Sequence, residues 1–223
     1  MQRQIKTHTV RCIVISNKSH ADVKFDIFER LNTNTYSLNA QELRNCVYRG
    51  IFNDLLGELV QGVEWLKIMG KSEPDNRMRD QELVLRYFSF QELKLSSYST
   101  PLKVWLNRMA QNARSYEEDK IENLKNKWNN MISVAIIVFD HKECFRRERG
   151  GLINKALFDL LSSTFSEISE ECALNNKSDI RGSYYSLLKN EEFDDLISRA
   201  VDHKSRTLRR FELWEQKFSW LSA

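Results

Sequence analysis

Two polar side chains in the first part of the chain, Arg30 and Asn32, are of types that bind phosphate. The arginine guanidinium offers a planar fork of hydrogen-bond donors that suits phosphate oxygens, and an asparagine amide can donate to a ligand or position a loop. The surrounding residues predict a turn from a helix into a loop. The alternative is that Arg30 pairs with Glu29 or Glu42, and that Asn32 only caps the turn.

Two clusters of basic residues occur later in the chain. They comprise Lys142, Arg146, Arg147 and Arg149, and then Lys204, Arg206, Arg209 and Arg210. Either cluster could contact a nucleic-acid backbone, because lysine and arginine make most phosphate contacts. If DNA binds, we expect Arg146, Arg147 and Arg149 to contact it. Such clusters more often form a solvated charged face, and this alternative stays open.

A third set of charges includes Asp80, Glu82 and Arg86, with Arg77 and Arg79 just before them. Apolar residues cover nearly all sides of this predicted helix, which is typical of a helix in the core. Buried charges must be paired. We therefore expect Asp80, Glu82 and Arg86 to form a structural network, with Glu82 and Arg86 spaced as an i, i+4 pair.

Metal and redox sites are not expected. The four histidines lack ligand spacing, and Cys12, Cys46, Cys144 and Cys172 contain no C-x-x-C pair. We expect buried, reduced thiols and a cytoplasmic protein. No apolar run is long enough to span a membrane and no secretory signal is evident, so no membrane association is expected.

The composition indicates which elements position these residues. The chain has 223 residues, with 34 Lys plus Arg against 31 Asp plus Glu and a formal net charge of +3. That net charge does not by itself predict nucleic-acid binding. Only seven Gly and two Pro are present. Such low usage excludes collagen-like folds, disfavours all-β folds with many turns, and favours long helices.

The pattern along the chain predicts one strand followed by helices. Residues 7–15 are rich in β-branched side chains and predict a short strand. Asn39 and Glu42 have the spacing of a capping box that starts a helix over about 40–48. Helical apolar spacing then continues over 51–69.

The remaining residues predict further helices. They are expected near 77–95, after Thr100 as an N-cap with Pro101 as the first helical residue, after a capping box at Ser115 and Glu118, and near 154–169, 184–188, 193–201 and 205–221. The predicted fold class is therefore mainly α, with about eight or nine helices and one or two short strands.

Three ordered segments carry a resemblance to a known family. Residues 24–50 read KFDIFERLNTNTYSLNAQELRNCVYRG, and residues 76–88 read NRMRDQELVLRYF. Residues 139–147, FDHKECFRR, are followed at 154–159 by NKALFD. Together these segments resemble the second half of the GmrSD-type domain, also called domain of unknown function 262.

The resemblance implies a remnant of a ParB/sulfiredoxin-like α+β core in residues 1–50, followed by a helical domain in residues 51–223. It also implies that Phe28, Arg30 and Asn32 bind nucleotide or phosphate. Family members are associated with modification-dependent restriction and anti-phage defence, often beside an HNH nuclease domain. The intact family protein could use a nucleoside triphosphate and a divalent metal, but none is expected in this chain.

The family's principal active-site motif, D-G-Q-Q-R, is absent, and the sequence contains no Asp-Gly dipeptide. We therefore expect a truncated or split GmrSD-type protein that is inactive alone. Whether the chain is part of an enzyme is left open, and no catalytic residue is assigned. Its partner would be an upstream-encoded half of the domain or an HNH nuclease subunit, and DNA is a possible ligand. The alternatives are a helical interaction module that completes a partner chain, and a non-functional gene fragment.

Overall fold

The structure is a computed structural model, and it describes residues 14, 21–31 and 37–222. Within these residues it contains twelve α-helices, three short 3-10 helices and no strand. The mainly α prediction is therefore confirmed, but the expected eight or nine helices were too few, because some predicted helices are divided and short ones were missed. The strand predicted over residues 7–15 lies outside the described residues except for Val14, so the ParB-like remnant stays a prediction, as does the domain boundary at residue 50.

The helices follow one another with short connections. In chain order they are α2 (Ala21–Leu31), α3 (Ala40–Val47), α4 (Ile51–Leu59), α5 (Val63–Met69), α6 (Arg79–Glu92), α7 (Leu102–Asn112), α8 (Glu118–Val138), α9 (Lys155–Phe165), α10 (Glu170–Asn175), α11 (Lys177–Leu188), α12 (Glu191–Ser198) and α13 (Lys204–Phe218). The 3-10 helices are η1 (Leu95–Ser97), η2 (Ala113–Ser115) and η3 (Ser219–Ser222).

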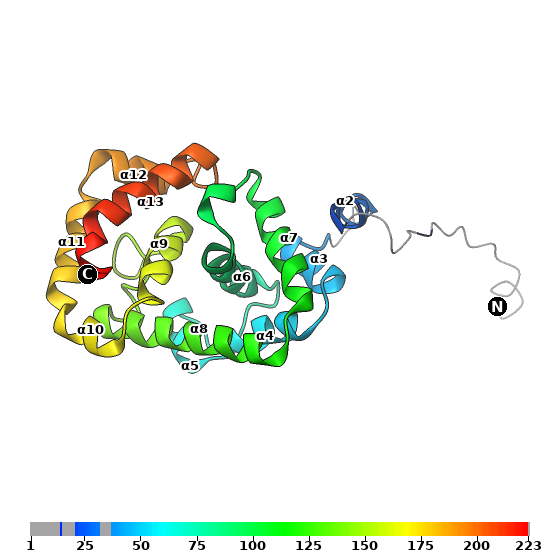
Figure 1. Cartoon of the computed structure of the whole chain (residues 1–223), viewed down its shortest axis with the longest axis horizontal. Helices are drawn as coiled ribbons and strands as arrows, with labels where there is room; N and C mark the ends of the chain where they lie inside the picture. The colour runs from blue at the N-terminus through cyan, green and yellow to red at the C-terminus, as the bar shows by residue number, and fades with distance from the viewer. Residues whose placement is uncertain (1–13, 15–20, 32–36, 223) are drawn as a thin grey trace, which may run out of the picture.

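Helix α6 lies at the centre, with α7, α8 and α9 around it (Figure 1). Its apolar residues cover most of its circumference, and five consecutive side chains from Leu83 to Tyr87 are buried, as is Phe88. Trp128 of α8 packs edge-on against Tyr87, with ring centroids 5.3 Å apart. Burial on all sides explains why this segment shows no clear polar face in the sequence.

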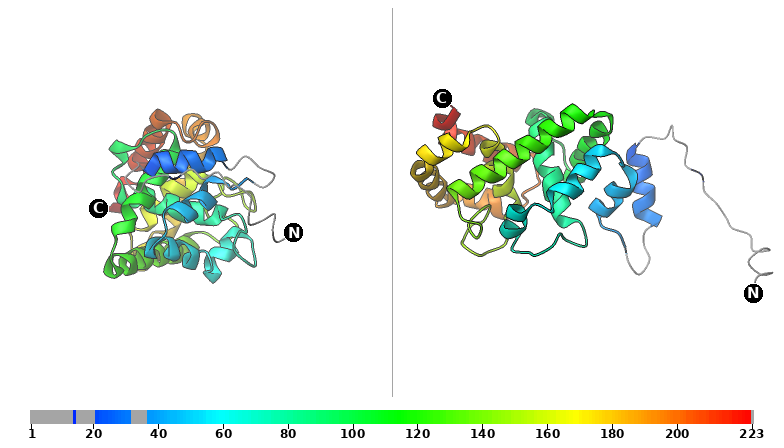
Figure 2. Two further views of the ribbon diagram at one scale, coloured as in Figure 1. Left: turned by 90° about the vertical axis from the view of Figure 1, so that its right-hand side faces the viewer. Right: turned by 90° about the horizontal axis from the view of Figure 1, so that it is seen from below.

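The C-terminal helices α10 to α13 pack together at one end of the molecule, and α2 lies at the other (Figure 2). Phe25 anchors α2 because it is fully buried under the cations of Arg44 and Lys103. The buried apolar side chains from Phe25 to Leu221 form one continuous cluster. Helices α2 and α3 thus share a core with the helices that follow.

The capping box at α3 is confirmed. The Asn39 side chain accepts from the Glu42 N–H, and the Glu42 carboxylate accepts from the Asn39 N–H. The box predicted at Ser115 is wrong. The Ser115 hydroxyl donates back to the Asn112 carbonyl, and Glu117 is the N-cap of α8.

Two other local predictions need correction, and one helix was not predicted. Pro101, and not Thr100, is the N-cap of α7. The predicted helix over 51–69 is two helices, because the chain turns between Leu59 and Val63. Helix α10 was not predicted, since its six residues are too short to show a helical period.

Candidate functional site

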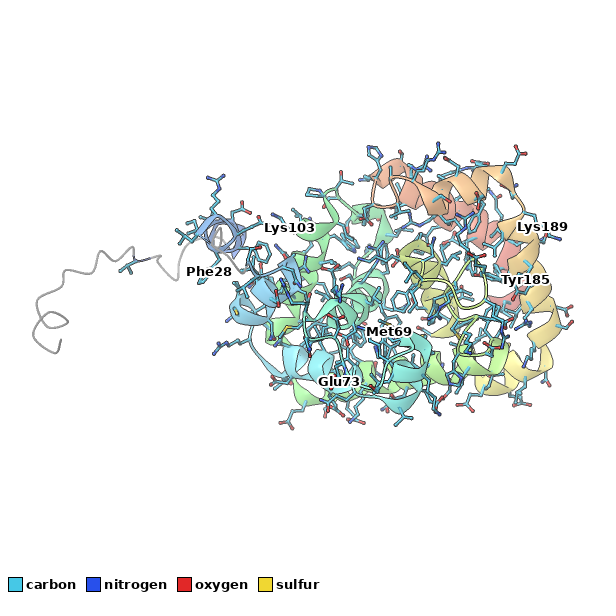
Figure 3. The ribbon with its side chains drawn as sticks, turned by 180° about the vertical axis from the view of Figure 1, so that it is seen from behind. Phe28, Met69, Glu73, Lys103, Tyr185 and Lys189 are labelled. Atoms are coloured by element: carbon cyan, nitrogen blue, oxygen red, sulfur yellow. The ribbon has the colours of Figure 1, made fainter. Side chains whose placement is uncertain are left out.

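The predicted phosphate-binding residues lie on and after α2. Arg30 and Phe28 are exposed, with 47% of Phe28 accessible, while Asn32 lies outside the described residues. The carboxylates that were alternative partners of Arg30 bond elsewhere, Glu29 to Lys103 and Glu42 to Arg77. Phe28 and Lys103 lie together at the α2 edge of the molecule (Figure 3). Arg30 and Phe28 are thus accessible, and their role stays a prediction.

Arg44, which the sequence did not single out, joins three helices just inside this edge. Its guanidinium donates to Asn107 of α7 at 2.9 Å, to Glu82 of α6 at 3.0 Å and to Gln41 of its own helix at 3.1 Å. Burial lowers the pKa of Arg44, and the Glu82 carboxylate partly offsets this effect. Only the Gln41–Arg44 spacing of three residues was visible in the sequence.

The loop before α6 is organised by Asp75. The Asp75 carboxylate accepts from the Arg79 side chain at 2.8 Å, from Lys71 Nζ at 2.5 Å and from the Arg77 N–H at 2.9 Å. The bond from Arg79 is the largest effect that holds the pKa of Asp75 well below its usual range. Asp80 in turn accepts from the Asp75 N–H at 2.7 Å. Asp80, one of the predicted network residues, therefore stabilises the loop before α6.

The other two predicted network residues bond to residues of other helices and not to one another. Glu82 pairs with Arg44 and, at 3.4 Å, with Lys155. Arg86 is fully buried and donates to both carboxylate oxygens of Asp159, at 2.5 and 2.7 Å. The expected i, i+4 pair is absent because each side chain reaches a partner across the core.

Asp159 is shared by two buried arginines. Arg210 of α13 donates to Asp159 at 3.2 Å and to the Val201 carbonyl. Arg86 also donates to Asp202, 3.0 Å away. The cluster of Arg86, Asp159, Asp202 and Arg210 therefore ties α6, α9 and α13 together. Arg210 was grouped with a basic surface cluster in the sequence, and the structure buries it completely.

Arg146, predicted as a nucleic-acid contact, holds the loop between α8 and α9. It donates to four backbone carbonyls, those of Ile68, His141, Cys144 and Gly151. Burial lowers the pKa of Arg146. Most of its donors are thus committed to the fold.

The two neighbouring predicted contacts are exposed but ion-paired. Arg147 pairs with Asp194 of α12, and Arg149 pairs with Asp140. In the second basic cluster, Arg206 pairs with Asp195 and Arg209 with Glu192. These cations are partly neutralised where they lie.

A cavity of about 1060 Å³ opens between the loop 70–79, the loop 140–153 and the first turns of α3 and α9. We call it the basic groove. Six cationic residues line it, against two acidic ones, Asp75 and Glu82; the six are Lys67, Lys71, Arg79, Lys142, Arg146 and Lys155. Met69, also on its wall, lies near the middle of the view in Figure 3. The sequence did not predict this site, because its residues come from segments that lie far apart along the chain.

Within the described part of the chain, no group of three or more His, Cys, Asp and Glu side chains could hold a metal ion. The expectation of buried thiols is only partly right, since Cys144 is buried but Cys46 is exposed and Cys172 half-buried. Burial raises the pKa of the Cys144 thiol to about 12. None of the described helices is long and apolar enough to cross a membrane.

No protein-family model, no curated protein and no solved structure matches this chain.

Proposed function

We propose that this chain is the helical part of a GmrSD-type protein and serves a nucleic-acid-targeting, modification-dependent defence system. The observation that supports the proposal is the contact between the segments that carry the resemblance. Arg86 of the segment 76–88 makes two charge-assisted hydrogen bonds to Asp159 of the segment 154–159. The Asn39 side chain, in the segment 24–50, donates to the Arg77 carbonyl at 2.6 Å.

The chain alone is proposed to be without nucleotide hydrolysis or DNA cleavage. Phosphoryl chemistry needs groups that hold and polarise phosphate, and the D-G-Q-Q-R motif that would supply them is missing from this sequence. A second polypeptide, an upstream-encoded half of the domain or an HNH nuclease subunit, would supply the reactive groups. A nucleoside triphosphate and a divalent metal would bind with that partner. Arg30 and Phe28 are the exposed residues through which this chain would contact the nucleotide.

The test is turnover by the purified chain, first alone and then with the product of the adjacent upstream reading frame. We expect no hydrolysis of nucleoside triphosphates and no cleavage of modified or unmodified DNA by the chain alone, and turnover when the partner is added. Arg30→Ala should lower that turnover. The matched control is Arg49→Ala, since Arg49 is also exposed. Hydrolysis or DNA cleavage by the chain alone would refute the proposal that it is inactive alone. If neither reaction occurs with the partner, the proposed function is refuted.

A second candidate function, an interaction module that completes a partner chain, is favoured by the surface of α2. Its apolar residues Val23, Phe28 and Leu31 are 48%, 47% and 63% exposed. Soluble proteins rarely leave such neighbouring apolar side chains open to water without a use. Phe28→Ser should reduce recovery of the co-expressed upstream product with this chain. Leu174→Ser, at another exposed apolar position, should not, and equal recovery with both variants contradicts this role.

A further inference from the structure

We propose that the basic groove binds the phosphodiester backbone of a nucleic acid, with Lys142 as its free cationic contact. This inference rests on the proposed nucleic-acid-targeting function and adds a location for the contact. The groove is lined by six cationic residues and two acidic ones. A concave wall of one charge sign concentrates the electrostatic field and attracts ligands of the opposite sign.

Carboxylates cancel only part of the positive charge in the groove, where Lys67 and Lys155 each have an ion-pair partner. A single carboxylate, Asp75, serves both Lys71 and Arg79. Arg146 bonds to backbone carbonyls, which carry no net charge. Lys142 is exposed, and its ammonium has no hydrogen-bond or ion-pair partner among the described residues. Three unbalanced cations therefore face the groove.

The fold holds Lys142 in place. Its N–H donates to the Asp140 carboxylate at 2.7 Å, and its carbonyl accepts from the Gly150 N–H at 2.8 Å. Arg146 fixes the same loop from inside by bonding to the carbonyls of His141 and Gly151. Binding a ligand to this loop needs little ordering of the backbone, which lowers the cost of association.

The lining favours a backbone over a free nucleotide. The cavity of about 1060 Å³ is slightly larger than the roughly 300–1,000 Å³ of small-molecule pockets. Among the described residues that line it there is no Phe, Tyr or Trp on which a base could stack. The cations come from separate segments of the chain, so several of them can contact one extended polyanion. Contacts of this type do not read sequence.

The experiment measures fluorescence anisotropy of a short labelled DNA duplex, and of a single strand of the same length, with the full chain. Lys142→Glu should weaken binding about ten-fold at low salt, and the slope of log K against log salt should become shallower by about 1. Lys142→Arg keeps the charge and should bind within about two-fold of the parent. Unchanged thermal unfolding of the variants shows that they fold, as expected for an exposed, unpartnered side chain.

The matched control is Lys189→Glu, which makes the same change in charge at an exposed site on the far edge of the molecule (Figure 3). It should bind within about two-fold of the parent. If Lys142→Glu and Lys189→Glu lose the same DNA affinity, only the total charge of the protein matters. That result would overturn the groove as the binding site but not nucleic-acid binding itself. Displacement of the duplex by ATP at equal phosphate concentration overturns the backbone assignment. If the parent binds neither DNA, the groove proposal fails, whereas the proposed function is decided by the complemented turnover assay.

Discussion

Replacing Asp159 by asparagine tests the buried charge cluster that ties α6, α9 and α13 together. The Asp159 side chain is fully buried and accepts three hydrogen bonds, two from Arg86 and one from Arg210. Asp159→Asn keeps the shape but removes the negative charge, and its amide NH₂ would face arginine donors. Asp202 remains beside Arg86, but it is 46% exposed and contacts only one of the two arginines.

The expected loss of stability follows from the two arginine charges that the substitution leaves buried. Removing one member of a buried ion pair costs about 3–5 kcal/mol, because the remaining charge stays buried without compensation. For a chain of this size, 1 kcal/mol corresponds to roughly 2–4 °C in Tm, so Tm should fall by about 6–20 °C. Since domains are stable by only about 5–15 kcal/mol, the variant should remain folded but marginal.

The assay is equilibrium unfolding in urea, followed by far-ultraviolet circular dichroism, together with thermal unfolding. Glu192→Gln is the control, since it removes the carboxylate of an exposed pair with Arg209 and should leave the midpoint unchanged. Adding Arg86→Gln to Asp159→Asn should cost less than the sum of the single changes, because the two residues share one interaction. A loss below about 1 kcal/mol for Asp159→Asn would refute the view that the cluster holds the helices together.

Four further predictions follow from local contacts. Asp75→Asn should cost about 1.5–3 kcal/mol at neutral pH. Because the folded pKa of Asp75 is depressed, its stabilisation is present above about pH 4, the unfolded value, and is lost as pH falls, so thermal unfolding of parent and variant should converge in acid. Exposed Cys46 should react with iodoacetamide in the native protein while buried Cys144 reacts only on unfolding, and equal rates by mass spectrometry would contradict this. Arg146→Lys loses the planar fork that joins four carbonyls, so residues 140–153 should exchange amide hydrogens faster, and unchanged exchange would show that Arg146 does not hold the loop. Asn39→Ala should lower stability by about 1 kcal/mol in urea unfolding, and no loss would show that its cap contributes nothing.

The helices were predictable from the sequence where a period or a motif acts locally. The apolar spacing over 77–95 marked α6, and the Asn39–Glu42 spacing marked the start of α3. The same reasoning failed at Ser115, because its hydroxyl completes the turn before it and not the helix after it. A serine hydroxyl can bond to the turn before it or to the helix after it, and the sequence alone does not show which of the two bonds forms.

The candidate site was predictable only in part, because its contacts join distant segments. Arg146 and Arg210 both stood in clusters typical of a charged surface, and both are buried. Their partners include the Ile68 carbonyl, 78 residues from Arg146, and the Asp159 carboxylate, 51 residues from Arg210. No local spacing records such contacts. Of the four cations in the cluster with Arg146, all of them described by the structure, Lys142 is the one whose side chain has no partner among the described residues.

The position of Arg210 also bears on the order in which the fold can form during synthesis. Chains are made from the N-terminus, and α13 (Lys204–Phe218) leaves the ribosome after the other α-helices that the structure describes. Until then Asp159 has Arg86 but not Arg210, and Trp214 has not reached the Thr164 hydroxyl to which it donates at 2.8 Å. The central charge cluster is therefore completed only after Arg210 has been synthesised, so a message that stops before Arg210 yields a nascent chain in which Asp159 lacks one of its two arginine partners.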